Sequence, residues 1–112
     1  MKVFVYGSLK KGFHNHRVLG DSEFVCTDIL SGYSLVDLGS FPMALPNPDG
    51  CILGEVYYIT PETLEALDRL ESEGSFYKRE VVNGNIEQCM FVYIGMRNEI
   101  KDGLCFWDKG YK

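Results

Sequence analysis

The hydrophobic pattern begins with a short run of β-branched and aromatic residues near the N-terminus. In residues 3–6 (VFVY) the two valines face one way, and Phe4 and Tyr6 face the other. An extended segment with apolar side chains on both faces predicts a strand that is buried on both sides. It ends in Gly7 and Ser8, where bare backbone N–H groups can hold a carboxylate or an oxyanion. An ordinary first strand followed by a turn would give the same pattern.

Apolar alternation predicts further strands, over residues 23–30, 32–38, 51–59, 77–82 and 86–94. Asn83 and Gly84, between the last two strands, are the strongest hairpin signal in the chain. Gly54 lies inside the strand 51–59 and indicates a bulge or a close approach of backbone. Residues 10–17 are polar and predict a loop with a short helical turn.

Residues 37–50 contain three prolines and two glycines, which oppose a regular element. Phe41, Met43 and Leu45 are nevertheless apolar and need cover. We therefore expect a structured loop that forms either a wall of a pocket or a cap over the core. Residues 48–50 (PDG) predict a turn.

One helix is strongly signalled, beginning after Thr60 and ending near residue 71 or 72. Thr60 suits the N-cap, Pro61 suits the first helical position, and Glu62 suits the positive end of the helix dipole. Strands outnumber helices, so the fold class is predicted as α+β. We expect a small, mostly antiparallel β-barrel with one or two helices.

With 112 residues, of which 46% are hydrophobic, the chain is long enough for one domain with a substantial core, expected over residues 1–112. Its net charge is −5 and it has no cluster of Lys and Arg, which argues against nucleic-acid binding. No apolar run approaches the roughly 20 residues that span a bilayer. The N-terminus also lacks the apolar core of a signal peptide, so we expect a cytoplasmic protein.

The sequence has four cysteines, Cys26, Cys51, Cys89 and Cys105. None of them belongs to a CxxC pair or lies near a histidine at metal-ligand spacing, so we expect no metal site. Reduced and mostly buried thiols are expected instead. His14 and His16 lie two residues apart in a loop, and two histidines do not make a metal site without further ligands.

Glu71 is the most informative polar residue of the predicted helix. Because successive helical residues turn by about 100°, Leu64, Leu67 and Glu71 share one face. A carboxylate on this buried stripe needs a partner or a raised pKa, and the helix dipole opposes its ionisation further. Such a group suits general acid/base chemistry near neutral pH. Alternatively, the last turn frays, and Glu71 turns to water or pairs with Lys78 or Arg79.

Residues 4–12 (FVYGSLKKG), with Asn15-His16 and Val18-Leu19 after them, resemble the N-terminal signature of the γ-glutamylcyclotransferase-like superfamily. The closest similarity is to its γ-glutamylamine cyclotransferase branch. Later segments resemble the same superfamily in the same order, namely 54–57 (GEVY), 67–71 (LDRLE), 77–79 (YKR) and 91–93 (FVY). The resemblance covers most of positions 3–94. Ser8 stands where the superfamily usually has Thr.

This resemblance implies a small barrel-like α+β fold with a pocket at its mouth. It also implies a reaction without cofactor or metal, in which the α-amine of a small γ-glutamyl molecule attacks the γ-carbonyl. The products are 5-oxoproline and a free amine. The resemblance gives the acid/base role to Glu71 and the binding of the glutamyl end to Tyr6, Gly7, Ser8 and Leu9.

Physical chemistry agrees with these roles. The substrate α-amine is mostly protonated at neutral pH, and a partly desolvated Glu71 can take its proton and later protonate the leaving nitrogen. The backbone amides of Gly7, Ser8 and Leu9 can either anchor the α-carboxylate or stabilise the oxyanion. Ser8 is expected to contribute its amide rather than a reactive hydroxyl. Because ring closure is intramolecular, the main task is to hold a folded substrate conformer.

Tyr77 and Tyr93 are candidate pocket walls or hydroxyl donors, and Arg79 is expected to support Glu71 or the sheet. Three functions are compatible with these residues. The leading one is a cyclotransferase that acts on a γ-glutamylamine or a related γ-glutamyl compound. The others are the same chemistry on a biosynthetic γ-glutamyl-protected intermediate, and a non-catalytic protein that binds a small molecule in the same pocket.

Overall fold

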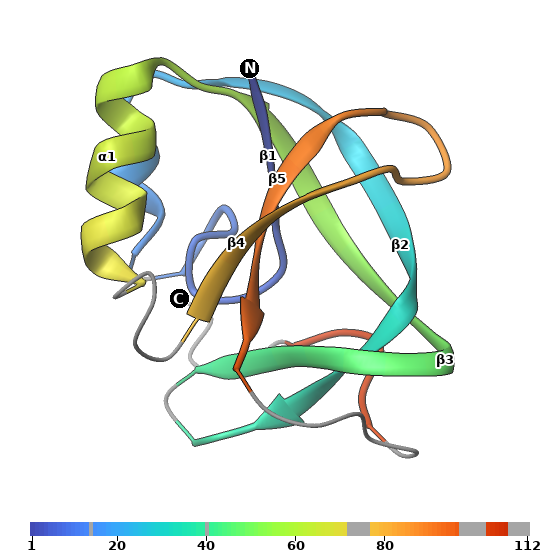
Figure 1. Cartoon of the computed structure of the whole chain (residues 1–112). Coiled ribbons are helices and arrows are strands. Elements are labelled where there is room, and N and C mark those ends of the chain that lie inside the picture. The colour runs from blue at the N-terminus through green and yellow to red at the C-terminus, as the bar shows by residue number, and fades with distance from the viewer. Residues whose placement is uncertain (14, 40, 72–76, 97–102, 108–112) are drawn as a thin grey trace.

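The computed structural model describes residues 1–13, 15–39, 41–71, 77–96 and 103–107 (Figure 1). The described residues form the strands β1 (Lys2–Val5), β2 (Glu23–Asp37), β3 (Pro42–Tyr58), β4 (Tyr77–Val82) and β5 (Met90–Gly95). They also form one α-helix, α1 (Pro61–Leu70), and one 3-10 helix, η1 (His16–Leu19). The helix α1 stands to one side of the sheet in Figure 1. The predicted α+β class is confirmed.

The first strand, β1, is central in a sheet whose strand order is β2-β3-β1-β5-β4. It pairs antiparallel with β3 and parallel with β5. Val3 and Val5 belong to one buried cluster, together with Leu67 of α1. Phe4 and Tyr6 belong to the other. The prediction that this strand is buried on both faces is therefore confirmed.

The sheet is not closed into a barrel, which corrects the predicted architecture. Among the described strands, β2 and β4 are the two edges. The β2–β3 register shifts between Ser31 and Tyr33, so that residues 47–50 of β3 face a single residue of β2. A bulge of this kind bends a strand pair. Beyond it, the pair crosses below the rest of the sheet in Figure 1.

The expectation of an irregular segment over residues 37–50 is wrong, because β3 already begins at Pro42. Prolines are tolerated at the start of a strand and at bulges, where a missing N–H group costs least. Pro42 is the first residue of β3, Pro46 borders the bulge, and Pro48 lies within it. The turn predicted at 48–50 is part of this bulge. The two short strands predicted before it are likewise one long strand, β2.

The helix α1 follows its predicted signals. The Thr60 hydroxyl accepts a hydrogen bond from the Thr63 N–H at 3.2 Å, which caps the N-terminus. The helix ends at Leu70, with Glu71 as its C-cap, and Leu67 is fully buried on the predicted face. No helix in the described part of the chain is long and apolar enough to cross a membrane.

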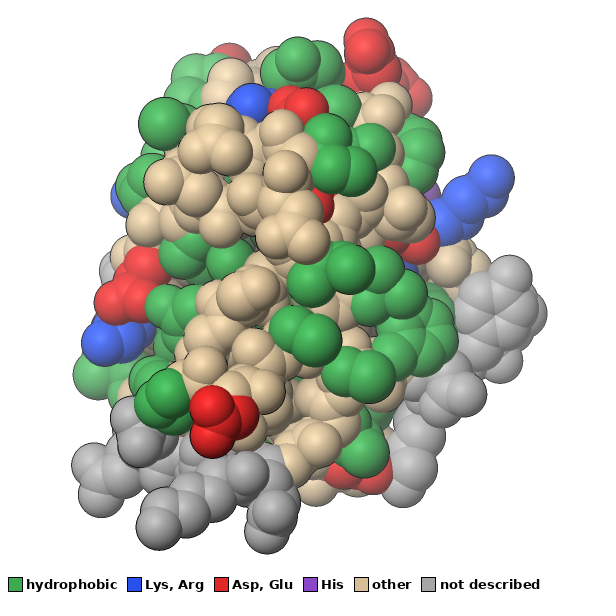
Figure 2. Space-filling model, turned by 90° about the vertical axis from the view of Figure 1, so that its right-hand side faces the viewer, with side chains coloured by type: hydrophobic (Ala, Val, Ile, Leu, Met, Phe, Trp, Pro, Cys, Tyr) green, Lys and Arg blue, Asp and Glu red, His purple; other side chains and the backbone are tan. Residues whose placement is uncertain are grey.

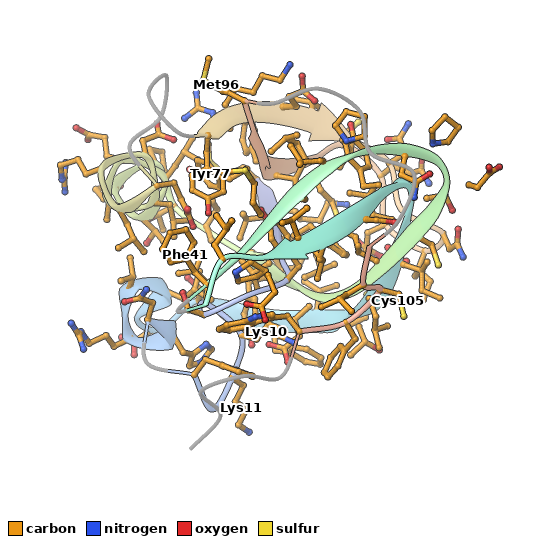
Figure 3. The ribbon with its side chains drawn as sticks, turned by 90° about the horizontal axis from the view of Figure 1, so that it is seen from below. Lys10, Lys11, Phe41, Tyr77, Met96 and Cys105 are labelled. Atoms are coloured by element: carbon orange, nitrogen blue, oxygen red, sulfur yellow. The ribbon has the colours of Figure 1, made fainter. Side chains whose placement is uncertain are left out.

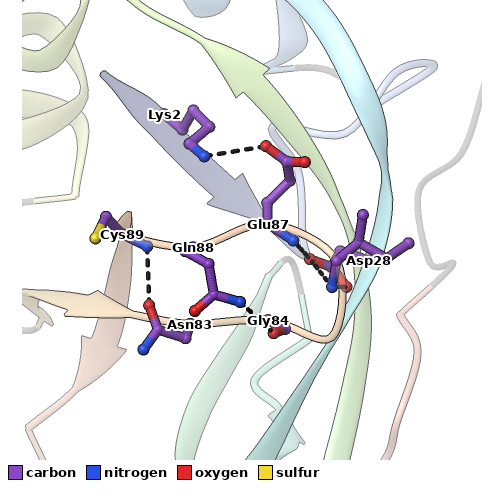
Figure 4. A network of polar contacts seen from close by, with 8 residues as sticks. Lys2, Asp28, Asn83, Gly84, Glu87, Gln88 and Cys89 are labelled. Carbon is purple, nitrogen blue, oxygen red and sulfur yellow. Dashed lines mark hydrogen bonds and ion pairs between the residues drawn. The ribbon is translucent and has the colours of Figure 1, made fainter.

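The hairpin of β4 and β5 is confirmed, but the predicted tight turn and the return strand from residue 86 are wrong. Residues 83–89 form the connection, and β5 begins only at Met90. The cause is Asp28 of β2 (Figure 4). Its carboxylate accepts hydrogen bonds from the N–H groups of Ile86 and Glu87, at 3.0 and 2.9 Å. This long-range contact competes with the strand ladder for those N–H groups.

The C-terminal segment packs onto the body through the buried Trp107, while Phe106 is exposed. Leu104 forms a β-bridge with Leu35 of β2. The ammonium group of Lys10, which is only 2% exposed, donates a hydrogen bond to the Trp107 carbonyl at 2.6 Å. It also lies 3.7 Å from the centre of the Phe106 ring. Lys10 thus links the loop after β1 to the C-terminal segment.

The expected burial of the cysteines is wrong for three of the four. Cys51, Cys89 and Cys105 are exposed, Cys26 is partly buried, and all four are free. The three exposed cysteines lie on β3, at the end of the β4–β5 connection and in the C-terminal segment. Tertiary structure sets their exposure. Figure 2 shows many other apolar side chains on the face opposite α1.

Gly54 confirms the predicted close approach of backbone and gives a test of the β1–β3 packing. A Cβ atom there would lie 2.5 Å from the Val5 carbonyl oxygen and 2.6 Å from the Phe4 ring. We expect Gly54→Ala to lower the free energy of unfolding by about 1–3 kcal/mol, measured by urea denaturation. Ser31→Thr, which adds a methyl group at an exposed strand position, should change it by less than about 0.5 kcal/mol. Equal losses in the two variants would contradict this account.

Asp28 gives a test of the β4–β5 connection. Burial opposes ionisation of Asp28, but backbone N–H donors from Ile29 and from residues 85–87 outweigh it and lower the pKa. We expect Asp28→Asn to lower the free energy of unfolding by about 1–3 kcal/mol at neutral pH. A lowered folded-state pKa stabilises the fold above the unfolded-state pKa, and this stabilisation is lost as the pH falls through the folded-state pKa.

The destabilisation by Asp28→Asn should therefore shrink in acid, as measured by urea denaturation across pH. The exposed Asp21 provides the control, and Asp21→Asn should show little effect at any pH. A destabilisation by Asp28→Asn that persists undiminished in acid would show that the ionised carboxylate is not what holds the connection.

Candidate active site

The loop after β1 turns its carbonyl groups toward donors of the protein. The carbonyl oxygens of residues 7, 8 and 9 accept hydrogen bonds from the Lys10 N–H, the Asn15 N–H and Nδ1 of His16, at 3.0, 3.0 and 2.8 Å. In a trans peptide the N–H points opposite to the carbonyl of the same unit, so the N–H groups of residues 8 and 9 point away from the donors that hold the carbonyls of residues 7 and 8. Within the described residues, the N–H groups of residues 7–9 donate to no acceptor. They are available to an anion.

Side chains fix this loop from β3 and from the start of η1. Glu55 of β3 accepts hydrogen bonds from the Lys11 N–H at 2.9 Å and from the Tyr57 hydroxyl at 2.8 Å. The Asn15 side-chain amide donates to the Ser8 hydroxyl oxygen at 2.9 Å. The role of Glu55 was not predicted, and the residue was noted only within the segment 54–57 that resembles the superfamily. Strand alternation cannot show that a side chain reaches a distant loop.

Gly7 and Pro42 bring the loop against the start of β3. A Cβ atom on Gly7 would lie 2.8 Å from the Pro42 ring, so glycine permits this contact. The Tyr77 hydroxyl donates to the Pro42 carbonyl at 3.1 Å, and in Figure 3 the Tyr77 side chain lies between α1 and the start of β3. The Tyr6 hydroxyl donates to the Tyr93 carbonyl at 2.6 Å. Four of the predicted site residues, Tyr6, Gly7, Tyr77 and Tyr93, therefore lie in one connected region.

Glu71 lies at the C-terminal end of α1, close enough to this region to interact with Tyr6. The pKa of Tyr6 is raised well above its ordinary value. The main cause is burial, and the second is the negative charge of Glu71. Burial also raises the pKa of Glu71 itself, from 4.5 to about 7. At neutral pH both forms of the carboxyl group are thus populated. This agrees with the expectation that a carboxyl group on the face of Leu64 and Leu67 has a raised pKa.

The cations expected as partners of Glu71 are held by other carboxylates. Lys78 lies 3.3 Å from a glutamate of its own strand, and Arg79 pairs with Asp68. The Tyr93 hydroxyl donates to the same Asp68 carboxylate at 2.6 Å. Sequence reasoning did not single out Asp68. Its position three residues before Glu71 was the available signal, because such residues are neighbours on a helix.

Of the two histidines of the polar segment, His14 lies outside the described residues. His16 supports the loop after β1 through its bond to the Leu9 carbonyl, and its ring lies 5.6 Å from that of Tyr57. In the described ranges, no three His, Cys, Asp or Glu side chains are grouped so that they could hold a metal ion.

Two chemical capacities are therefore adjacent. A carboxyl group with a pKa near 7 can exchange a proton with an ammonium group at neutral pH. Free backbone N–H groups can hold a carboxylate or an oxyanion. A small substrate that carries both an amine and a carboxylate matches this pair of capacities.

Burial of Glu71 predicts a folding penalty that depends on pH. Since the folded-state pKa is raised, ionisation disfavours the fold, and stability is lost as the pH rises from 4.5 through about 7. Glu71→Gln cannot ionise, so it should be more stable than the wild type above about pH 8, by up to roughly 3 kcal/mol, because one pKa unit is about 1.4 kcal/mol. This advantage should disappear below the ordinary pKa of glutamate.

Urea denaturation across this pH range measures the advantage. Glu65→Gln is the matched control, because the Glu65 side chain lies on the same helix and is 76% exposed. It should show no comparable pH dependence. A Glu71→Gln advantage that is constant with pH would contradict the burial of an ionisable carboxyl group.

Comparisons with known proteins support the same assignment. The sequence model of the γ-glutamyl cyclotransferase, AIG2-like family matches residues 3–108. The γ-glutamylcyclotransferase family protein YtfP of Escherichia coli K12 is 35% identical over 82 residues, which cover 73% of this chain and 72% of YtfP. The γ-glutamylaminecyclotransferase C of Danio rerio is 36% identical over 100 residues, which cover 76% of this chain and 66% of that protein.

Solved structures share the fold. The uncharacterized protein PH0828 from Pyrococcus horikoshii has a TM-score of 0.79 at 26% identity, over 94% of this chain and 86% of that chain. An AIG2-like protein from Mus musculus has a TM-score of 0.74 at 27% identity, over 85% and 76% of the two chains. The chain therefore belongs to the γ-glutamyl cyclotransferase, AIG2-like family and is a cyclotransferase enzyme of that kind.

Proposed function

We propose that this protein converts a γ-glutamylamine or a related γ-glutamyl compound to 5-oxoproline and a free amine, with Glu71 as the general acid/base. The observation that carries the proposal is the burial of Glu71, which raises its pKa to about 7, next to the end of β1. The zebrafish relative, a γ-glutamylamine cyclotransferase by name, supports an amine as the leaving group.

The proposed reaction begins with proton transfer. The ionised Glu71 takes a proton from the α-ammonium group of the substrate, and the neutral amine attacks the γ-carbonyl carbon. A carbon–nitrogen bond closes the five-membered ring, and the carbonyl oxygen becomes an oxyanion. Glu71 then returns its proton to the leaving nitrogen as the old carbon–nitrogen bond breaks. The ring nitrogen loses a second proton on becoming an amide, and the released amine takes this proton up as its ammonium form. No water is consumed, and the side chain ends in its starting state.

Substrate binding is assigned to the loop after β1. The N–H groups of Gly7, Ser8 and Leu9 hold the α-carboxylate or stabilise the oxyanion. Either use is compatible with the finding that these groups donate to no acceptor in the described part of the chain. Tyr77 and Tyr93 contribute ring surface to the site. Their hydroxyl protons are already donated to protein oxygens, at 3.1 and 2.6 Å.

The test is the release of 5-oxoproline from a panel of small substrates. The panel contains γ-glutamylamines, γ-glutamyl dipeptides, glutathione and γ-glutamyl-protected biosynthetic intermediates. We expect turnover of at least one class, and a loss of about 10²–10⁴-fold in Glu71→Gln. The exposed control Glu65→Gln should keep the wild-type rate.

Two results would overturn the assignment. Saturable binding of these compounds without release of 5-oxoproline would favour a binding protein, in which Glu71 grips an ammonium group. Equal turnover by the wild type and Glu71→Gln would retain the reaction but remove Glu71 from the acid/base role.

A further inference from the structure

Asp68 connects the C-terminal half of α1 to two strands at once. One oxygen of its carboxylate accepts a hydrogen bond from the Tyr93 hydroxyl of β5, at 2.6 Å. The other pairs with the guanidinium group of Arg79 on β4. The Asp68 and Arg79 side chains are only 29% and 31% exposed, so this ion pair is partly shielded from water. The arrangement is a three-residue clamp of Asp68, Arg79 and Tyr93.

Arg79 is a cation of β4 that is tied to the last turns of α1, just before Glu71. Residues two apart on a strand share a face, so Arg79 shares one with Tyr77 of the candidate site. It also binds Asp68, which lies three residues before Glu71, and residues at this spacing are neighbours on a helix surface. Arg79 is therefore bound by the carboxylate that neighbours Glu71 along the helix.

We propose that Asp68 is a positioning residue, which anchors the end of α1 to β4 and β5 and holds the Arg79 guanidinium away from Glu71. This inference rests on the proposed function, in which Glu71 is the acid/base. Two contacts orient the Arg79 guanidinium. One is its partner Asp68, whose carboxylate is itself held by the Tyr93 hydroxyl. The other is the Phe91 ring, whose centre lies 5.1 Å from Cζ of Arg79.

The chemical reason is charge. An opposite charge within about 4–6 Å of a carboxylate favours its ionised form and lowers its pKa, typically by 1–3 units. A Glu71 paired with Arg79 would be ionised but a weak base toward an ammonium group. The other titratable or charged groups on the surrounding elements are Lys2 of β1, Tyr6 after it, His16 and Arg17 of η1, Tyr77, Lys78 and Glu80 of β4, and Tyr93 of β5, with Glu62, Glu65 and Arg69 on α1 itself. Of the two β4 cations, Lys78 is already paired within its own strand.

The test is a direct titration of Glu71 by carboxyl ¹³C NMR, which needs no turnover. In Asp68→Asn the amide keeps the shape and an oxygen acceptor for Tyr93, but Arg79 loses its counter-ion. We expect the Glu71 pKa to fall by at least one unit. In the double variant Asp68→Asn/Arg79→Met the cation is gone as well, and the Glu71 pKa should return to within about 0.3 units of the wild type.

Two outcomes would overturn the proposal. One is an unchanged Glu71 pKa in folded Asp68→Asn. The other is a rise of more than about one unit in the double variant, which would mean that Arg79 already pairs with Glu71 in the wild type. If Asp68→Asn does not fold, the Glu71 pKa of the double variant is the deciding measurement. A rise of more than about one unit overturns the proposal, and a value within about 0.3 units of the wild type supports it. Failure of the wild type to release 5-oxoproline would leave the titration intact and would count only against the proposed function.

Discussion

The two-sided burial of β1 is the constraint on which the rest of the structure depends. Its valines pack toward α1, and Phe4 and Tyr6 pack into the opposite cluster. A strand between two cores needs neighbours on both edges, which β3 and β5 supply. It also has to end where the backbone can turn sharply, and Gly7 ends it against Pro42. The loop with free N–H groups is a direct consequence of this ending.

Burial of Glu71 follows from the same packing. The helix α1 covers the valine side of β1, so the face with Leu67 is buried, and the C-cap position of that face is Glu71. The free energy lost by burying a carboxyl group is a cost to the fold, but it yields a group that exchanges protons at neutral pH. Asp68 takes the nearby guanidinium group, which leaves desolvation as the cause of the raised pKa.

Features set by local sequence could be predicted. The helix start at Thr60, the central strand β1 and the strand β4 each depend on capping or on alternation within a few residues. The position of Glu71 followed from helical periodicity alone. The connection 83–89 could not be predicted, because its conformation depends on Asp28, more than fifty residues away in sequence.

The proline-rich half of β3 and the open sheet were missed for the same kind of reason. Local breakers such as Pro46 and Pro48 argue against a strand, but the bulge opposite β2 accommodates them. The sheet nevertheless stays open, with β2 and β4 as its two edges among the described strands. The role of Asp68 was hidden because its partners, Arg79 and Tyr93, lie on two later strands.

Glu71, which is partly buried at the C-cap of α1, is the proposed proton acceptor in catalysis. The most direct measurement compares two pKa values in the wild-type protein, one from the acid limb of kcat/KM against pH and one from a ¹³C NMR titration of the Glu71 carboxyl group. The account predicts that both lie near 7 and agree within the error of the measurements. A Glu71 that titrates near the value of free glutamate, or an acid limb that does not follow its titration, would contradict the claim.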